Sequence, residues 1–181
     1  MSEITVGKRY AKSLIDLAEE QNNLEAVKAD MIFFVQTLKA NSELATVLRN
    51  PIISHDKKIK ILDSIFGGKV TQPTSSFLRI MADKGRAELL YSTALEVVNQ
   101  YDVIKHIVTA SVVSAAPLSD ANRAEISAEV ARLAGGQVVL KEKVDPAIIG
   151  GFILTVGDKQ LDASLAGSLK KLRKDFAVEA I

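Results

Sequence analysis

Three aspartates in the last third of the chain carry side chains that catalysis could use. Asp145, Asp158 and Asp162 are carboxylates, and general acid–base catalysis needs two carboxyl groups whose pKa values are held apart. Each of the three stands beside a predicted turn, where aspartate commonly accepts hydrogen bonds from the backbone. The sequence therefore favours turn-capping roles, and an enzyme built on this cluster is the competing hypothesis.

A phosphate-binding loop is the second kind of site to consider. Residues 67–71 read Gly-Gly-Lys-Val-Thr. A P-loop needs Gly five positions before Gly68, where this chain has Asp63, and Ser or Thr after Lys69, where it has Val70. We interpret the segment as the end of a helix followed by a loop, and no nucleotide site is predicted.

Composition restricts metal and thiol chemistry. The chain contains no Cys and two His, His55 and His106. Thiolate zinc sites, iron–sulfur clusters and cysteine nucleophiles are therefore excluded, and so is a three-His zinc site within one chain. Neither His belongs to a recognisable catalytic motif. We predict no catalytic residue, no metal and no cofactor.

Charge gives no general attraction to nucleic acid or anionic lipid, because 23 Lys and Arg balance 22 Asp and Glu to a net +1. The basic run Lys170, Lys171, Arg173 and Lys174 is interpreted as the solvated face of a helix. A nucleic-acid adaptor that uses this run is a further competing hypothesis.

No stretch reaches the roughly 20 apolar residues of a membrane helix, and no signal peptide is expected.

The elements that must position these residues fall into two groups. In the first group, apolar residues at 3.6-residue spacing predict six amphipathic helices joined by short connections. They cover residues 4–21, 24 to about 40 behind Asn23 as cap, 42–50, 55–66 behind Ser54 as cap, 71–84 and about 89–104. Ile32 and Phe33 lie off the main apolar face of the second helix and suggest burial on two sides. We predict an antiparallel six-helix bundle over residues 1–105.

The second group, residues 106–181, is predicted to form a smaller α+β domain, which makes the whole chain mainly α. β-Branched residues after His106 predict a strand up to Pro117, and a helix capped by Ser119 leads to a strand at 138–144. A hairpin follows at 152–156 and 159–162, where Gly157-Asp158 suits a type II′ turn. The final helix begins near Ser164 and carries an apolar stripe of Leu165, Leu169, Leu172 and Phe176.

An absence of catalytic motifs combined with many amphipathic helices points to a protein that binds other proteins through grooves between helices. On the residues alone, the interpretation is a helical-bundle adaptor. The alternative for each single helix is that its apolar face only forms core.

Several blocks of the chain carry a family resemblance. They are GKRYAKSL at 7–14, RNPI at 49–52, SFLRI at 76–80 with Gly85-Arg86, SAAPLS at 114–119, VDPAIIGGF at 144–152, VGD at 156–158 and DASL at 162–165. In this order they resemble the delta subunit of bacterial F-type ATP synthase, a family similar to the mitochondrial oligomycin-sensitivity-conferring protein. The family usually has Gly at the position of Ala163 and Leu at one of Ile148 and Ile149.

The resemblance implies a non-catalytic stator subunit, part of the peripheral stalk, that links the catalytic head to the stalk so that proton-driven rotation is coupled to ATP synthesis. It implies that the N-terminal bundle binds the N-terminal helix of an alpha subunit in a groove between the first and fifth helices. The matching residues are Tyr10, Ser13, Leu14, Leu17, Phe77, Ile80 and Met81.

At the other end, the resemblance implies that the C-terminal region binds the C-terminal end of the b-subunit stalk, with the stripe Leu165, Leu169, Leu172 and Phe176 as candidate contacts. It implies no cofactor and no nucleic acid. The expected location is the cytoplasmic face of the bacterial inner membrane, where the protein is held peripherally through the complex.

Overall fold

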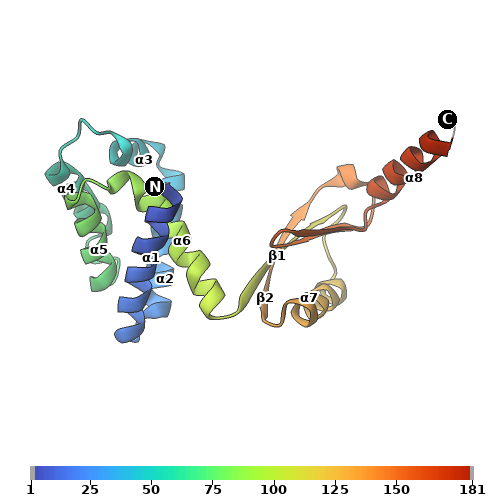
Figure 1. Ribbon diagram of the computed structural model, residues 1–181, viewed down its shortest axis with the longest axis horizontal. Coiled ribbons are helices and arrows are strands. Elements are labelled where there is room, and N and C mark those ends of the chain that lie inside the picture. Colours follow the sequence, from blue (N-terminus) through green and yellow to red (C-terminus); the bar gives the residue numbers. More distant parts are fainter. Residues whose placement is uncertain (1–2, 180–181) are drawn as a thin grey trace. The chain divides into compact units, whose positions relative to one another are not determined.

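The computed structural model describes the backbone of residues 3–179 and the side chains of residues 5–132 and 135–173 (Figure 1). The chain folds into two compact units, Met1–Ile104 (unit 1) and Lys105–Ile181 (unit 2). Unit 1 is helical, and unit 2 combines a four-stranded sheet with helices. The predicted fold class, mainly α with a smaller α+β part at the C-terminal end, is confirmed.

Helices account for the regular structure that is described in unit 1. They are α1 (Glu3–Glu20), α2 (Leu24–Ala40), α3 (Ser42–Arg49), α4 (His55–Phe66), α5 (Gln72–Asp83), the short 3-10 helix η1 (Ala87–Leu89) and α6 (Leu90–Ile104). Their ends follow local rules. Pro51 lies beyond the end of α3, Pro73 stands in the first turn of α5, and Gly85 follows α5 with a φ of 70°.

One hydrophobic cluster with members from all six α-helices forms the core of unit 1. Phe34 of α2 and Phe66 of α4 are fully buried, and their ring centroids lie 5.0 Å apart. α1 and α2 both pack against α6, and α4 packs against α5. The 3.6-residue apolar spacing read from the sequence therefore identifies the faces that the helices bury.

Three local predictions for unit 1 are wrong. Ile32 and Phe33 are 36% and 38% exposed, because the buried residues of α2 lie on another face. Phe33 contacts Phe66 edge-on, with 5.8 Å between the ring centroids, but this contact does not bury it. Asn23 and Ser54 occupy the positions before α2 and α4, but neither side chain accepts a capping hydrogen bond.

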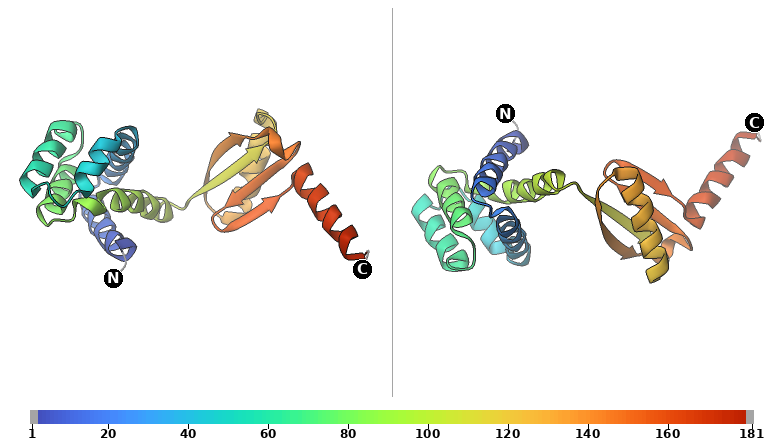
Figure 2. Two further views of the ribbon diagram at one scale, coloured as in Figure 1. Left: turned by 90° about the horizontal axis from the view of Figure 1, so that it is seen from above. Right: turned by 90° about the horizontal axis from the view of Figure 1, so that it is seen from below.

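The sheet of unit 2 has the strand order β2-β1-β3-β4. The strands are β1 (Ile107–Ser114), β2 (Gln137–Val144), β3 (Phe152–Val156) and β4 (Lys159–Asp162). β1 and β2 are parallel and are joined by α7 (Asp120–Ala134), which lies along one face of the sheet (Figure 2). β3 is antiparallel to both β1 and β4.

Turn chemistry in unit 2 follows the sequence closely. The Ser119 hydroxyl accepts a hydrogen bond from the Asn122 N–H at 3.2 Å, so the predicted cap of α7 is confirmed. Gly157 has a φ of 60° whereas Asp158 is not among the described residues with positive φ, which fits the predicted type II′ turn. The chain then enters α8 (Leu165–Glu179).

Thr93 generates a stability prediction. Its Oγ1 is buried where α6 meets Gly7 of α1, and it has no hydrogen-bond partner in the described structure. Thr93→Val should stabilise unit 1 by about 1 kcal/mol, because an unsatisfied buried hydroxyl costs about 1–3 kcal/mol and valine has a similar shape. Urea unfolding monitored by tyrosine fluorescence measures this, since Tyr10, Tyr91 and Tyr101 all lie in unit 1.

Thr74→Val is the matched control. Thr74 is equally buried, but its hydroxyl is hydrogen-bonded to Thr71 Oγ1 at 3.1 Å. This variant should lose about 1 kcal/mol. A Thr93→Val variant that is destabilised as much as Thr74→Val would contradict the prediction.

Candidate partner-binding surfaces

Two contacting helices of unit 1, α1 and α5, carry the small and apolar side chains that the resemblance identifies as partner contacts. α1 packs against α5. Tyr10, Ser13 and Leu17 lie on α1, and Phe77 and Ile80 lie on α5; we call these five residues the α1–α5 surface. Tyr10 and Phe77 are half-buried, whereas Ile80 is 56% exposed although it is a large aliphatic residue. An apolar surface between two helices is what a partner helix can bind.

Leu14 and Met81, which the resemblance places with these residues, lie beneath this surface. Each is only 1% exposed and belongs to the core cluster. They hold α1 and α5 together but offer almost no area to a partner. Spacing alone could not separate them from Leu17 and Ile80, because all lie on apolar helix faces.

The surroundings of Tyr10 contain two polar side chains, Ser13 and Arg86. The Ser13 hydroxyl donates to the Arg9 carbonyl at 3.1 Å, so this small exposed residue leaves room beside Tyr10 without an unpaired group. The Arg86 guanidinium lies 5.2 Å from the centroid of the Tyr10 ring. This cation–π contact, which residue spacing does not predict, places a positive charge beside the α1–α5 surface.

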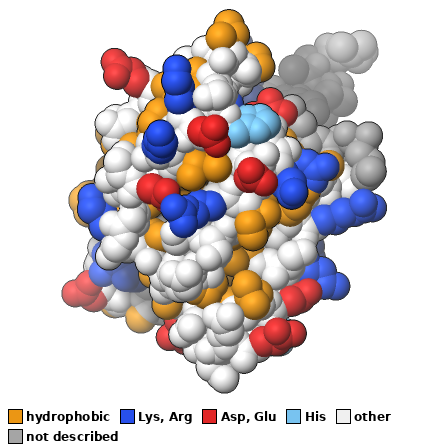
Figure 3. All heavy atoms as spheres, turned by 90° about the vertical axis from the view of Figure 1, so that its left-hand side faces the viewer, with side chains coloured by type: hydrophobic (Ala, Val, Ile, Leu, Met, Phe, Trp, Pro, Cys, Tyr) orange, Lys and Arg blue, Asp and Glu red, His pale blue; other side chains and the backbone are white. Residues whose placement is uncertain are grey.

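α5 is anchored to its neighbours by charged groups. One oxygen of the Asp30 carboxylate, from α2, accepts from both the Thr71 N–H and the Thr71 hydroxyl at 2.7 Å, so it caps the N-terminus of α5. Arg79 of α5 pairs with Asp63 of α4 at 2.7 Å. On the side of the molecule that carries α4 and α5, exposed hydrophobic side chains lie among charged ones (Figure 3).

α8 presents the second candidate surface. Leu165, Leu169 and Leu172, the α8 stripe, are 55%, 60% and 56% exposed. The side chain of Phe176 lies outside the described residues. Leucines at intervals of four and three residues on one helix face, all mostly exposed, form an apolar strip that lacks a cover within the described chain.

The start of α8 is fixed by a hydrogen-bonded turn. Asp162 Oδ1 accepts from the Ser164 N–H at 2.9 Å and from the Ser164 hydroxyl at 2.6 Å. The same hydroxyl accepts from the Gly167 N–H at 2.9 Å, so Ser164 caps α8. The hydroxyl of Ser164, and after it its N–H, hold the pKa of Asp162 below its usual range.

Two glycines allow β3 to meet this turn. Gly151 has a φ of 75°, and a Cβ atom there would lie 2.2 Å from the Ala163 carbonyl oxygen. The Gly150 carbonyl accepts from the Leu165 N–H at 2.9 Å. This close backbone approach joins blocks 144–152 and 162–165 into one structural feature, which we call the α8 joint.

A groove between α7 and the β3–β4 hairpin was not identified from the sequence. Two cavities of about 570 Å³ and 400 Å³ share Leu154 and Leu161 as lining residues. Ile126 and Phe152 complete the apolar wall of the first. Leu161 is the sequence signal that could have indicated it, because it is the single apolar residue of the short strand KQLD, and the structure leaves it 58% exposed.

The three candidate aspartates lie at turns, and two of them accept hydrogen bonds from nearby backbone N–H groups. Asp145 Oδ1 accepts from the Ala147 N–H at 2.9 Å, Asp162 belongs to the α8 joint, and Asp158 lies in the hairpin turn. Within the described residues, no group of three acidic or His side chains could hold a metal ion. At Gly67, a Cβ atom would lie 2.3 Å from the Asp63 carbonyl oxygen. The end of α4 therefore leaves no room for a side chain at this position, which explains the glycine.

Comparison with known proteins gives full-length matches. Residues 6–176 match the family described as ATP synthase delta (OSCP) subunit. ATP synthase subunit delta of Cytophaga hutchinsonii is 39% identical over 181 residues, 100% of this chain and 99% of that protein. ATP synthase subunit delta of Desulfitobacterium hafniense (strain Y51) is 33% identical over 172 residues, 95% of this chain and 96% of that protein.

A similar solved structure comes from a mitochondrial complex. A chain in the cryo-EM structure of the Toxoplasma gondii mitochondrial ATP synthase hexamer aligns with a TM-score of 0.71 at 27% identity, covering 94% of this chain and 97% of that chain. No helix in the described part of the present chain is long and apolar enough to cross a membrane.

The α8 joint generates a second prediction. Gly151→Ala should destabilise unit 2 by about 2–5 kcal/mol, because a left-handed alanine costs about 1–2 kcal/mol and the clash with the Ala163 carbonyl adds an overpacking penalty of about 1–3 kcal/mol. Amide hydrogen exchange of the full chain measures the loss in unit 2.

Gly157→Ala serves as the control, since Gly157 also has a positive φ but a Cβ there would meet nothing within 4 Å. It should cost only about 1–2 kcal/mol. Equal losses in the two variants would show that the close approach at the joint is unimportant.

Proposed function

We propose, from the premise that the chain belongs to the ATP synthase delta (OSCP) subunit family, that it holds the catalytic head of the enzyme and its peripheral stalk together without catalysing a reaction. Family membership makes it a peripheral-stalk subunit of ATP synthase and leaves an unrelated adaptor without support. The full-length family match, together with exposed apolar surfaces on two separate compact units, carries the proposal.

A stator has to bind two partners at once and release neither during rotation. Slow release requires affinity of about nanomolar or better, which corresponds to roughly −12 kcal/mol. Apolar helix faces can supply such affinity when a partner covers them. Unit 1 and unit 2 each present such a face, so each partner has its own unit and need not compete with the other.

For the head, the proposed ligand is the N-terminal helix of an alpha subunit, bound on the α1–α5 surface. Tyr10, Ser13 and Leu17 follow one another at intervals of three and four residues, which suits side-by-side packing with another helix. Small Ser13 permits close approach, and Tyr10 offers area with a polar end. Leu14 and Met81 support this surface from the core.

For the stalk, the proposed ligand is the C-terminal end of the b subunit, bound on the α8 stripe. The joint fixes the first turn of α8 through Asp162, Ser164 and Gly167, so the three leucines are presented on an ordered helix start. Phe176 continues the stripe in the sequence.

Neither proposed partner interaction requires a cofactor or nucleic acid, and the basic run of α8 needs no ligand of its own. The relatives in Cytophaga and Desulfitobacterium are bacterial proteins. We therefore place the chain at the cytoplasmic face of a bacterial inner membrane, attached through the membrane-associated complex of which it is a subunit.

The α1–α5 surface is tested by Ile80→Asp. A charged side chain in an apolar contact must be desolvated, so affinity for a peptide of the same organism's alpha-subunit N-terminus should fall at least about tenfold. Affinity for a soluble C-terminal segment of the b subunit should not change. Calorimetric titration of the full chain with each ligand measures both.

Ile52→Asp is the matched control, because Ile52 is 90% exposed and lies outside both surfaces. It should bind both ligands as the parent chain does. Two outcomes would be inconsistent with a separate head site on this surface. One is that folded Ile80→Asp binds both ligands more weakly, and the other is that Ile52→Asp loses as much affinity for the alpha peptide as Ile80→Asp does.

The α8 stripe is tested by Leu169→Ala, with Lys170→Ala on the polar face of the same helix as control. Burial of a leucine side chain contributes about 1.5–3 kcal/mol, so the b segment should bind at least about fivefold more weakly to Leu169→Ala. Lys170→Ala should bind almost normally. Equal affinities of the two variants for the b segment would argue against the stripe.

A further inference from the structure

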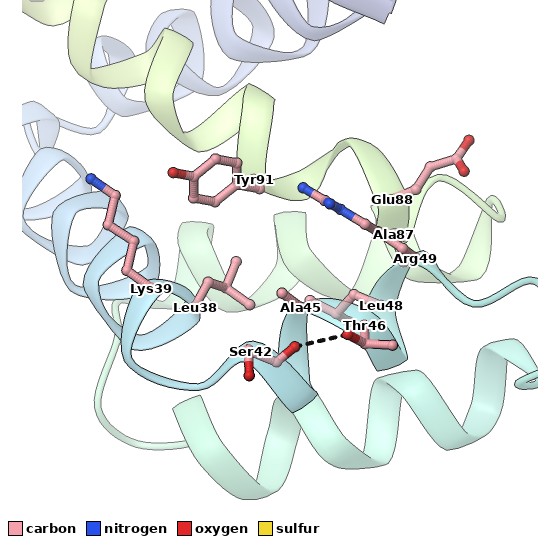
Figure 4. A pocket seen from close by; sticks show the side chains of 10 residues that line it. All are labelled: Leu38, Lys39, Ser42, Ala45, Thr46, Leu48, Arg49, Ala87, Glu88 and Tyr91. Atoms are coloured by element: carbon pink, nitrogen blue, oxygen red, sulfur yellow. Dashed lines mark hydrogen bonds between the residues drawn. The ribbon is translucent and has the colours of Figure 1, made fainter.

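A cavity of about 370 Å³ opens in unit 1 between α2, α3, η1 and α6 (Figure 4). Its size falls in the range of about 300–1,000 Å³ that small-molecule sites occupy. The lining residues that matter here are Leu38, Lys39, Ala45, Leu48, Arg49 and Tyr91. No residue that lines the cavity belongs to the α1–α5 surface, so the stator function does not account for it.

The floor of the cavity is apolar and belongs to the packed core. Leu38, Leu48 and Ala87 are buried, and Ala45 packs against the same core from α3. A small residue at Ala45 leaves the space that a longer side chain would fill. The floor therefore suits a compact apolar body.

The rim of the cavity is cationic. Arg49 and Lys39 form no ion pair within the described structure, and Glu88 forms none either. In Figure 4, the Arg49 guanidinium extends toward the Tyr91 ring, whereas the Glu88 carboxylate points the other way. An adjoining polar cavity of about 400 Å³ shares Arg49, Glu88 and Tyr91.

The backbone on either side of Arg49 is held by hydrogen bonds. Lys58 is buried and its ammonium donates to the Leu48 carbonyl at 2.8 Å, while the Asn50 side chain accepts from the Ile52 N–H at 2.9 Å. These contacts hold the C-terminal end of α3, whose last residue is Arg49. Lys39 and Arg49 both lie in the last turn of a helix, which favours cations there, but the helix dipole does not explain the open apolar cavity below them.

We propose that this cavity binds a small amphipathic organic anion. Its aromatic or branched apolar body lies over Ala45 of α3, above the buried side chains of Leu38 and Leu48. Its carboxylate is bound by the Arg49 guanidinium, whose planar donors match a carboxylate. The proposal does not rest on the stator function, because it uses a different part of unit 1.

The test is an NMR titration of the ¹⁵N-labelled full chain with 2-naphthoate as probe. Saturable amide shifts are expected at Ala45, Arg49 and Tyr91, with a Kd of about a millimolar for a ligand of this size. Arg49→Gln should weaken binding at least about fivefold, and 2-naphthamide, which lacks the charge, should bind weaker by a similar factor.

Lys60→Gln is the control for charge, since it removes one positive charge from an exposed side chain outside the cavity. It should leave the Kd unchanged. Ala45→Met, which fills the floor, should abolish the shifts while the alpha-subunit peptide still binds. The proposal is overturned if 2-naphthoate gives no saturable shifts at these residues. It is also overturned if the Kd for 2-naphthoate is the same in the parent chain, Arg49→Gln and Lys60→Gln, and 2-naphthamide binds the parent chain with that same Kd.

Discussion

The close packing of the Gly151 backbone against Ala163 and Ser164 is the contact on which the C-terminal surface depends. It brings the start of β3 against the end of β4, and Asp162 and Ser164 then set the first turn of α8. Because the helix start is held by backbone and capping contacts, the leucines of the stripe need not pack on the sheet to be ordered. An exposed apolar face on a fixed helix start suits a component that transmits force between partners.

Asp30 has the corresponding role in unit 1. Its carboxylate caps α5 from α2, so the helix that carries Phe77 and Ile80 is tied to a neighbour other than α1. Leu14 and Met81 then close the core beneath the α1–α5 surface. In both units, a polar capping contact fixes a helix whose outer apolar side chains are left for a partner.

Helix and strand positions could be predicted because apolar spacing, proline and glycine act locally, as at Pro51, Gly85 and Gly157. Which apolar residues are buried and which are exposed could not be predicted from these local signals. Leu14 and Leu17 lie on one helix and differ in exposure only through what packs on them. The same holds for Ile32 and Phe33, and for the cap of α5, which comes from a residue 41 positions earlier in the chain.

A stator has to hold its two partners at the same time, and calorimetric titration tests this most directly. The alpha-subunit N-terminal peptide is titrated into the full chain alone, and into the full chain saturated with the C-terminal segment of the b subunit. The account predicts one-to-one binding in both titrations, with affinities that agree within about threefold. Absence of binding by the folded chain, or loss of alpha-peptide binding once the b segment is present, would contradict it.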